Sequence, residues 1–391
     1  MGKYVHKFAN QAAYDQARKN NYIEPWVSYT ENVGISFNKS YDEKLYDMPF
    51  TIEALGTGLI SWNLSNQTLQ YSKNGGSWET MNSETSIPVV DGDEIQFKGV
   101  NENYQQMTVS STANFNVVGN IMSLTDGDNF KNADSINESA FYGLFSGCTT
   151  LLSARYLKLP IMELASNCYS NMFQGCTNMI SAPNLPATTL ASNCYSTMFN
   201  GCTSLIAAPE LPATTVETYC YYGMFNGCTS LITAPNLPAT NTKTYCYGFM
   251  FKDTKISVAP ELLATELTIG CYQSMFEGCV ELVEAQEILP ATSTVSSCYR
   301  CMFKGCTSLE RAPKLSATTL VSNCYLEMFN GCSSLNYIEA MFTTTPGTSY
   351  TKNWVSGVAS TGIFVKSASA SWNSTGVNGV PTGWTVQTAL S

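Results

Sequence analysis

Apolar residues in the middle of the chain recur at a fixed spacing. In one copy, Cys194, Tyr195, Met198 and Phe199 stand at positions i, i+1, i+4 and i+5, and Gly201 follows them. This spacing gathers apolar side chains on one face of a short helical turn, and glycine commonly stands just past a helix end. The pattern therefore predicts a short helical segment with one buried face.

The pattern returns from about residue 141 to residue 342, and most copies are 26 residues apart. Each copy continues into a short extended stretch, such as Thr203 to Pro212, where prolines limit strand pairing because they lack an N–H group. A period of this length predicts a solenoid with one short strand and one short helical segment in each coil. The copies align on Phe145, Phe173, Phe199, Phe225, Phe251, Phe276, Phe303, Phe329 and Phe342.

The repeat motif resembles a known family. Phe-x-x-Cys-x-x-Leu, as in Phe199, Cys202 and Leu205, followed by a proline-bearing turn, is similar to the BspA-like class of leucine-rich repeats. Here Met-Phe replaces the usual Ala-Phe, the period is longer and a Cys-Tyr pair is added. The resemblance covers about half of the chain. It implies a surface protein of the kind found in gut Bacteroides and their (crAss-like) phages.

Residues 1–48 differ from the rest in composition. Lys3 to Asn20 predicts a helix, and an aromatic extended run with Tyr22, Trp26 and Tyr29 follows it. A segment this short cannot bury so many aromatic rings by itself. We therefore expect an anchor or oligomerisation segment, with Tyr22, Trp26 and Tyr29 as its contacts.

The remaining flanks predict β structure. Residues 49–125 predict a small β-sandwich, because short apolar strands alternate with turns. Residues 126–342 form the predicted solenoid, and the β segments of residues 343–391 suit a cap over its open end. The whole chain is expected to be mainly β with short helices. The strands expected in the sandwich are Pro49–Leu55, Leu59–Trp62, Leu69–Tyr71, Ile87–Val90, Ile95–Phe97 and Phe115–Val118.

Composition narrows the classes of partner. The formal net charge is −10 and charged residues make up 13% of the chain, so we expect neither nucleic acid nor an anionic membrane as a partner. No apolar run is long enough to span a bilayer, and the first ten residues lack the apolar core of a secretory signal.

Cysteines number 15, and 14 of them fall into two columns of the repeat. Cys194 and Cys202 represent the two columns, and along a helix their separation would be roughly 12 Å, beyond disulfide reach. We expect a reduced, buried ladder of thiols rather than a disulfide scaffold. Cys298 and Cys301 form one Cys-x-x-Cys pair, but histidine is absent from the array, so no metal site is expected.

The sequence offers little for catalysis. His6 is the only histidine, which argues against Ser-His-Asp and Cys-His mechanisms. Glu277, Glu281, Glu284 and Glu287 could supply a pair of catalytic carboxylates, but a solvated edge is the simpler interpretation. A calcium loop is the alternative to a plain turn at Asp126, Asp128 and Asn129. We expect a protein that is not an enzyme and that has no cofactor.

One column of the repeat changes from copy to copy. Its first half is apolar, whereas Glu284, Arg311 and Tyr337 make its second half polar and charged. A constant frame with one variable column is how a solenoid presents a ligand face, so these three residues are the predicted ligand contacts.

Two function classes fit this pattern. The first is a virion fibre or decoration protein that docks on a capsid or tail protein through residues 1–48 and offers its repeats to a host-surface glycan or protein. Such a protein would lie on the virion surface, and a homotrimer is expected because fibres are usually symmetric oligomers. The alternative is an adhesin on a bacterial cell surface that binds host protein or glycan.

Overall fold

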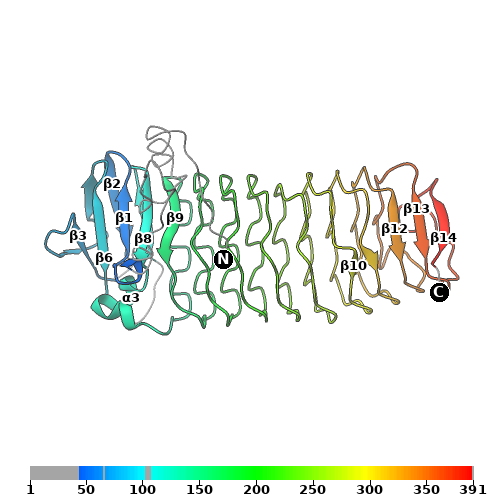
Figure 1. Cartoon of the computed structure of the whole chain (residues 1–391), viewed down its shortest axis with the longest axis horizontal. Coiled ribbons are helices and arrows are strands. Elements are labelled where there is room, and N and C mark those ends of the chain that lie inside the picture. Colours follow the sequence, from blue (N-terminus) through cyan, green and yellow to red (C-terminus); the bar gives the residue numbers. More distant parts are fainter. Residues whose placement is uncertain (1–43, 65–66, 102–106, 390–391) are drawn as a thin grey trace, which may run out of the picture.

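The computed structural model describes residues 44–64, 67–101 and 107–389, and it is mainly β with few short helices, as predicted. The molecule is elongated: β-sheets stand at one end, coils of chain stack along the long axis, and further strands close the other end (Figure 1). The predicted helix Lys3 to Asn20 and the predicted anchor residues Tyr22, Trp26 and Tyr29 lie outside the described residues. Within the described ranges, no helix is long and apolar enough to cross a membrane.

Residues 49–120, together with the later strand β9 (Leu151–Lys158), form two packed sheets. One has the strand order β4-β3-β6-β1-β8-β9 and the other the order β5-β2-β7. Phe50, Trp62 and Phe97 meet in their core, with ring centroids 5.0–6.0 Å apart. All six predicted strands are present, and the structure adds two that were not predicted, β4 and β7. The bounds are β1 Thr51–Ala54, β2 Gly58–Asn63, β3 Leu69–Lys73, β4 Glu79–Met81, β5 Ser86–Val89, β6 Glu94–Lys98, β7 Thr108–Ser111 and β8 Phe115–Asn120.

The larger sheet passes directly into the stacked coils. Two short helical elements, α3 (Ser123–Asp126) and η1 (Gly127–Asn132), follow β8. The chain then returns in β9 (Leu151–Lys158), which pairs in parallel with β8. Ser153 in β9 bridges to Ser181 of the next coil. One row of backbone pairing therefore connects the sheets to the coils.

The segments predicted to be helical are not helices. In one coil, Met198 N–H donates to Tyr195 O, three residues back, at 3.2 Å. The neighbouring Phe199 N–H instead donates to Met224 O of the next coil at 3.0 Å. This alternation repeats along the segment, so half of its N–H groups close β-turns and half join adjacent coils. We call this segment, residues 193–201 in this coil, the turn ladder.

The backbone conformation explains why no helix forms. Asn193, Thr197 and Gly201 have φ of 56°, 52° and 74°, so a left-handed residue recurs every four positions. An α-helix requires right-handed residues throughout and bonds from each N–H to the carbonyl four residues back. The predicted buried face is nevertheless correct, because Cys194 and Met198 are fully buried.

Aromatic rings stack along the interior of the coils. One ladder runs from Phe145 to Phe329 with centroids 5.3–5.9 Å apart, and a second runs from Phe141 to Tyr325 with centroids 5.7–6.0 Å apart. Phe50 of the sheets packs on the first ring of the phenylalanine ladder at 6.0 Å. A single apolar core therefore runs the length of the described chain.

Strands and tryptophans close the far end. Five parallel strands pair in the order β10-β11-β12-β13-β14. Trp354 covers Phe329 at 6.1 Å, and Trp372 stacks on Phe342 at 5.3 Å. The strands are β10 Ile288–Leu289, β11 Lys314–Leu315, β12 Tyr337–Ala340, β13 Ile363–Lys366 and β14 Thr385–Thr388.

All 15 cysteines are free and buried, in agreement with the predicted ladder of thiols. The thiol of Cys202 donates to Phe173 O of the preceding coil at 3.0 Å. This bond links successive coils and uses a carbonyl that the turn ladder leaves with a spare lone pair. The equivalent bond is made by Cys176, Cys228, Cys279, Cys306 and Cys332.

The buried thiols lead us to expect a loss of stability in alkali. Burial raises the pKa of Cys194, Cys228, Cys279 and Cys332 to about 12. Below the unfolded pKa of about 8.5 this stability is fully present, and it is lost as pH rises toward the folded pKa, because only the unfolded state releases protons. The midpoint of urea unfolding should stay level from pH 7 to about pH 8 and then fall increasingly as the pH rises to about 10.

A single substitution provides the control for that series. Cys228→Ser keeps a small hydrogen-bond donor but removes one titrating thiol. Above the unfolded pKa, the unfolding free energy of this variant should therefore fall less steeply with pH, by about 1.4 kcal/mol per pH unit. A midpoint that stays constant across the series would contradict the buried-thiol ladder.

The left-handed positions of the turn ladder also make a testable case. Gly227 has φ +73°, and a Cβ added there would lie 3.7 Å from its nearest neighbours, so Gly227→Ala causes no clash. It does force alanine into the left-handed region, which should lower the unfolding free energy by about 1–2 kcal/mol in urea titrations. Gly347→Ala is the control, since its Cβ meets nothing within 4 Å. Equal stability of the two variants would refute the strain argument.

Candidate ligand face

Glu284, Arg311 and Tyr337 stand in one column on the strand side of the coils. Parallel bridges join Val258 to Glu284 and Arg311 to Tyr337. The column continues into β13, where Tyr337 pairs with Ile363. The structure therefore places Arg311 directly beside Tyr337, whereas Glu284 pairs with Val258 of the preceding coil and has no bridge to Arg311 within the described part of the chain. Glu284 and Arg311 are exposed and Tyr337 is half-buried.

A pocket of about 430 Å³ opens at the charged end of this column. Its walls come from three successive coils, so no single repeat contains the site. The guanidinium carbon of Arg311 lies 3.6 Å from the centroid of the Tyr337 ring, which is a close cation–π contact. The lining residues are Glu287, Ile288, Arg311, Ala312, Lys314, Tyr337 and Glu339.

A carboxylate organises the polar wall of the pocket. Lys314 Nζ lies 2.8 Å from Glu339 Oε1, and the Tyr337 hydroxyl donates to Glu339 Oε2 at 3.4 Å. Glu339 is the more buried partner of the ion pair, with 19% of its side chain exposed against 37% for Lys314. Arg311 lines the same pocket and makes no ion pair with any described residue.

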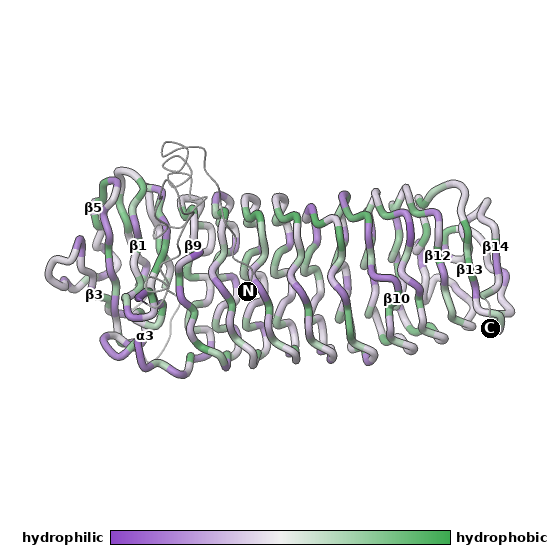
Figure 2. Tube along the Cα trace, viewed as in Figure 1, coloured by the Kyte–Doolittle hydropathy of each residue, from purple (hydrophilic) through white to green (hydrophobic). Residues whose placement is uncertain are grey.

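An apolar hollow adjoins the charged pocket. It has a volume of about 300 Å³ and shares Glu287 and Ile288 with its neighbour. Leu263 and Ile288 are 44% and 45% exposed, which is high for large apolar side chains. Farther along the strand side, Ile206, Ile232 and Val283 are also about half exposed. Figure 2 shows hydrophobic and hydrophilic stretches succeeding one another within the coils.

The glutamates considered as catalytic carboxylates are held by lysines or stand apart from one another. Glu277 pairs with Lys252 at 2.9 Å, and Glu281 lies 3.8 Å from Lys255. Glu281, Glu284 and Glu287 are exposed, which fits the solvated edge favoured from the sequence. Among the described residues, no cluster of three potential metal ligands occurs.

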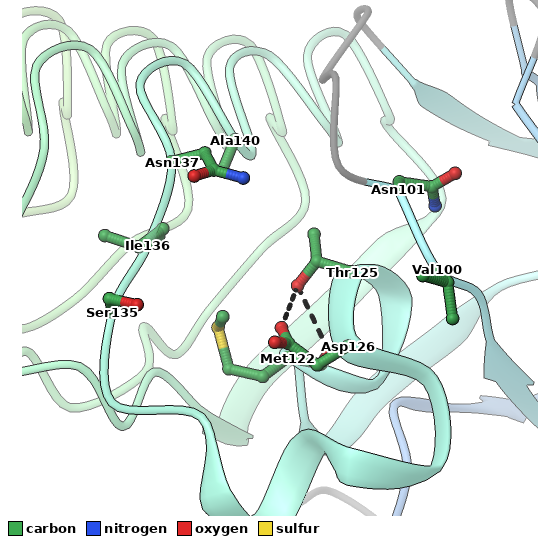
Figure 3. A pocket seen from close by; sticks show the side chains of 9 residues that line it. All are labelled: Val100, Asn101, Met122, Thr125, Asp126, Ser135, Ile136, Asn137 and Ala140. Carbon is green, nitrogen blue, oxygen red and sulfur yellow. Dashed lines mark hydrogen bonds between the residues drawn. The ribbon is translucent and has the colours of Figure 1, made fainter.

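A second hollow, of about 330 Å³, lies between the sheets and the first coil (Figure 3). The Thr125 hydroxyl donates to Asp126 Oδ2 at 2.6 Å, and Asn101 Nδ2 donates to Leu124 O at 2.7 Å. The calcium alternative placed Asp126 beside Asp128. Instead, Asp128 binds Lys98 at 2.7 Å, so the two carboxylates have different partners. This arrangement fits a structural turn.

Sequence reasoning found the column but missed part of the pocket. Lys314 and Glu339 were not singled out, although Glu339 stands two residues after Tyr337 and so on the same face of β12. That alternation was the available signal for Glu339. Lys314 carried no such signal, because it follows Pro313 at a point where the pairing offset between coils changes.

The contact between Arg311 and Tyr337 can be measured directly. A double-mutant cycle with Arg311→Ala and Tyr337→Leu should give a coupling of about 0.5–1 kcal/mol in unfolding free energy, the usual range for a cation–π pair at an exposed site. The pair Lys255→Ala and Tyr337→Leu, which share no contact, should give a coupling near zero. A coupling energy near zero for Arg311 and Tyr337 would show that their contact does not contribute measurably to stability.

Comparison with known proteins finds no matching family model, no matching curated protein and no matching solved structure, so the chain is assigned to no family here.

Proposed function

We propose that this chain is a non-enzymatic attachment protein built as a BspA-like leucine-rich-repeat solenoid. In this proposal residues 1–48 dock the protein on its carrier, the coils hold the binding face away from that carrier, and the β tail caps the open end. The ligand face consists of Glu284, Arg311 and Tyr337 together with the pocket residues Lys314 and Glu339.

The observation that supports this proposal is the placing of the charged pocket. The first half of the strand-side column is small or apolar, and only its last coils combine cations, carboxylates and an aromatic ring. Arg311 is held by Tyr337 and has no carboxylate partner among the described residues, so its donors suit an acidic group of a ligand. The adjoining apolar hollow would take a less polar part of the same ligand.

The resemblance of the repeats to the BspA-like class suggests what the protein is attached to. We propose a virion fibre or decoration protein that attaches to a capsid or tail protein, forms a homotrimer and recognises a glycan or protein on the host surface. A bacterial cell-surface adhesin is the alternative, because the same repeat class serves both settings.

Binding to cells tests the function. Fluorescently labelled protein would be incubated with intact gut Bacteroides cells and, separately, with epithelial cells, and bound protein measured by flow cytometry. Arg311→Ala should lower the apparent affinity by roughly tenfold, the usual loss when an interface cation is truncated. Lys352→Ala is the control, since it removes an exposed cation away from the pocket.

The outcomes separate the candidates. Binding to Bacteroides cells by a particle of about three chain masses in light scattering supports the virion fibre. Binding to epithelial cells by a single chain supports the adhesin. If Arg311→Ala and Lys352→Ala bind like the unsubstituted protein, the proposed ligand face is wrong.

A further inference from the structure

Four aromatic rings gather on the turn-ladder side of two adjacent coils. The rings of Tyr219 and Tyr245 stack with centroids 5.2 Å apart and an interplanar angle of 7°. The Tyr222 ring stands edge-on to Tyr219 and to Phe249, at 5.4 Å from each. All four side chains are half-buried, so each keeps part of its ring in contact with solvent. We call these four residues the aromatic cluster.

The cluster is not part of the packing that holds the coils together. The interior tyrosine and phenylalanine ladders run past it without interruption, through Tyr221 and Phe225 in the same coil. In other coils the positions equivalent to Tyr219 and Tyr245 carry small or polar residues. Asn193 and Asn323 stand where Tyr219 and Tyr245 stand in their coils, and both are left-handed like them.

These positions are unfavourable for aromatic residues. Tyr219, Tyr245 and Phe249 have φ of 55°, 51° and 59°, in the region that asparagine and glycine tolerate and bulky side chains do not. The left-handed backbone itself recurs along the coils, where residues such as Asn171, Thr197 and Ser274 occupy it, so the choice of a bulky ring and not the conformation sets this cluster apart. Three strained rings on the surface, where asparagine serves in other coils, call for a role outside the fold.

Glycines in the next coil make room for the rings. A Cβ added to Gly270 would lie 2.3 Å from the Tyr245 ring, and one added to Gly248 would lie 3.2 Å from the Tyr222 ring. The Tyr245 and Tyr222 rings therefore each pack against the backbone of a glycine in the following coil. Because the glycines leave space for the rings, the four aromatic side chains can lie against the coils and form one continuous surface.

The border of the cluster is polar and carries little net charge. Asn193, Asn226 and Gln273 lie in the turn ladders of the same or neighbouring coils and are partly exposed. The nearby cation Lys252 is neutralised by Glu277 at 2.9 Å. An aromatic surface bordered by amides suits a ligand with one face of C–H groups and hydroxyls around its edge, which is the chemistry of a pyranose ring.

We propose that the aromatic cluster of Tyr219, Tyr222, Tyr245 and Phe249 is a binding site for neutral polysaccharide, with a sugar ring stacked on the aromatic surface. The site lies on a different side of the coil from the charged ligand face and in earlier coils. It therefore does not depend on the attachment function proposed above, and the two sites can be tested separately.

The test uses variants that the repeat itself supplies. In Tyr219→Asn/Tyr245→Asn, both strained tyrosines are replaced by the residue found at the same position in other coils. The full-length protein and this variant would be titrated with dextran, yeast mannan and arabinogalactan, and binding followed by affinity gel electrophoresis and tyrosine fluorescence. The variant should lose at least roughly tenfold in affinity for the polysaccharide that binds, while its melting temperature is unchanged or higher.

Two controls make the result specific. Tyr142→Ala removes a half-buried tyrosine from the same outward column as Tyr222, in a coil that offers it no ring partner among the described residues, and should leave binding unchanged. Arg311→Ala should also leave polysaccharide binding unchanged. The proposal is overturned if none of the three polysaccharides binds, if the double variant binds as tightly as the unsubstituted protein, or if Arg311→Ala abolishes the same binding.

Discussion

The coils depend on backbone hydrogen bonds that cross from each coil to the next. In the turn ladder, every second N–H group donates to a carbonyl of the following coil, and the N–H groups between them close β-turns within their own coil. A coil standing alone would lose these hydrogen bonds and would also expose to water the apolar side chains that stack on the next coil, which is costly. Stacking is therefore the condition for the turn-ladder conformation, and the cysteine thiols add a further bond between coils.

Because of this stacking, the inward-facing residues of the coils are fixed by packing, whereas the outward-facing residues are available for binding. Inward columns must repeat a ring or a side chain of similar size, because each stacks on its copy one coil away; Phe141 begins the tyrosine ladder and Thr254 replaces one thiol. Outward columns meet solvent and can change without disturbing the stack. The two surfaces proposed for binding both use this freedom: Arg311 and Tyr337 on the strand side, and the aromatic cluster on the turn-ladder side. In the aromatic cluster, three of the four rings, those of Tyr219, Tyr245 and Phe249, occupy left-handed backbone positions that asparagine fills in some other coils.

Much of the fold could be predicted from the sequence, and the errors have identifiable causes. The six strands found in advance have runs of apolar or β-branched residues, whereas β4 (Glu79–Met81) is short and β7 (Thr108–Ser111) is mostly polar, so neither carries that signal. The helical segments were wrong because the spacing of Cys194, Tyr195, Met198 and Phe199 reports which side chains are buried together. It does not report where their N–H groups donate. A chain of β-turns with left-handed residues every fourth position buries the same side chains.

The sequence by itself determined the period, the buried columns, the free thiols and the pairing of Arg311 with Tyr337, because each of these follows from which residues recur at a constant spacing. Only the tertiary structure decided the rest. It placed the sheet of β8 against β9, so that one line of pairing continues into the coils. It also brought Glu339 to Lys314, and Tyr245 over Gly270, from neighbouring coils. Such contacts join residues about one repeat apart in the sequence, and their geometry depends on small changes of offset between coils that no local pattern records.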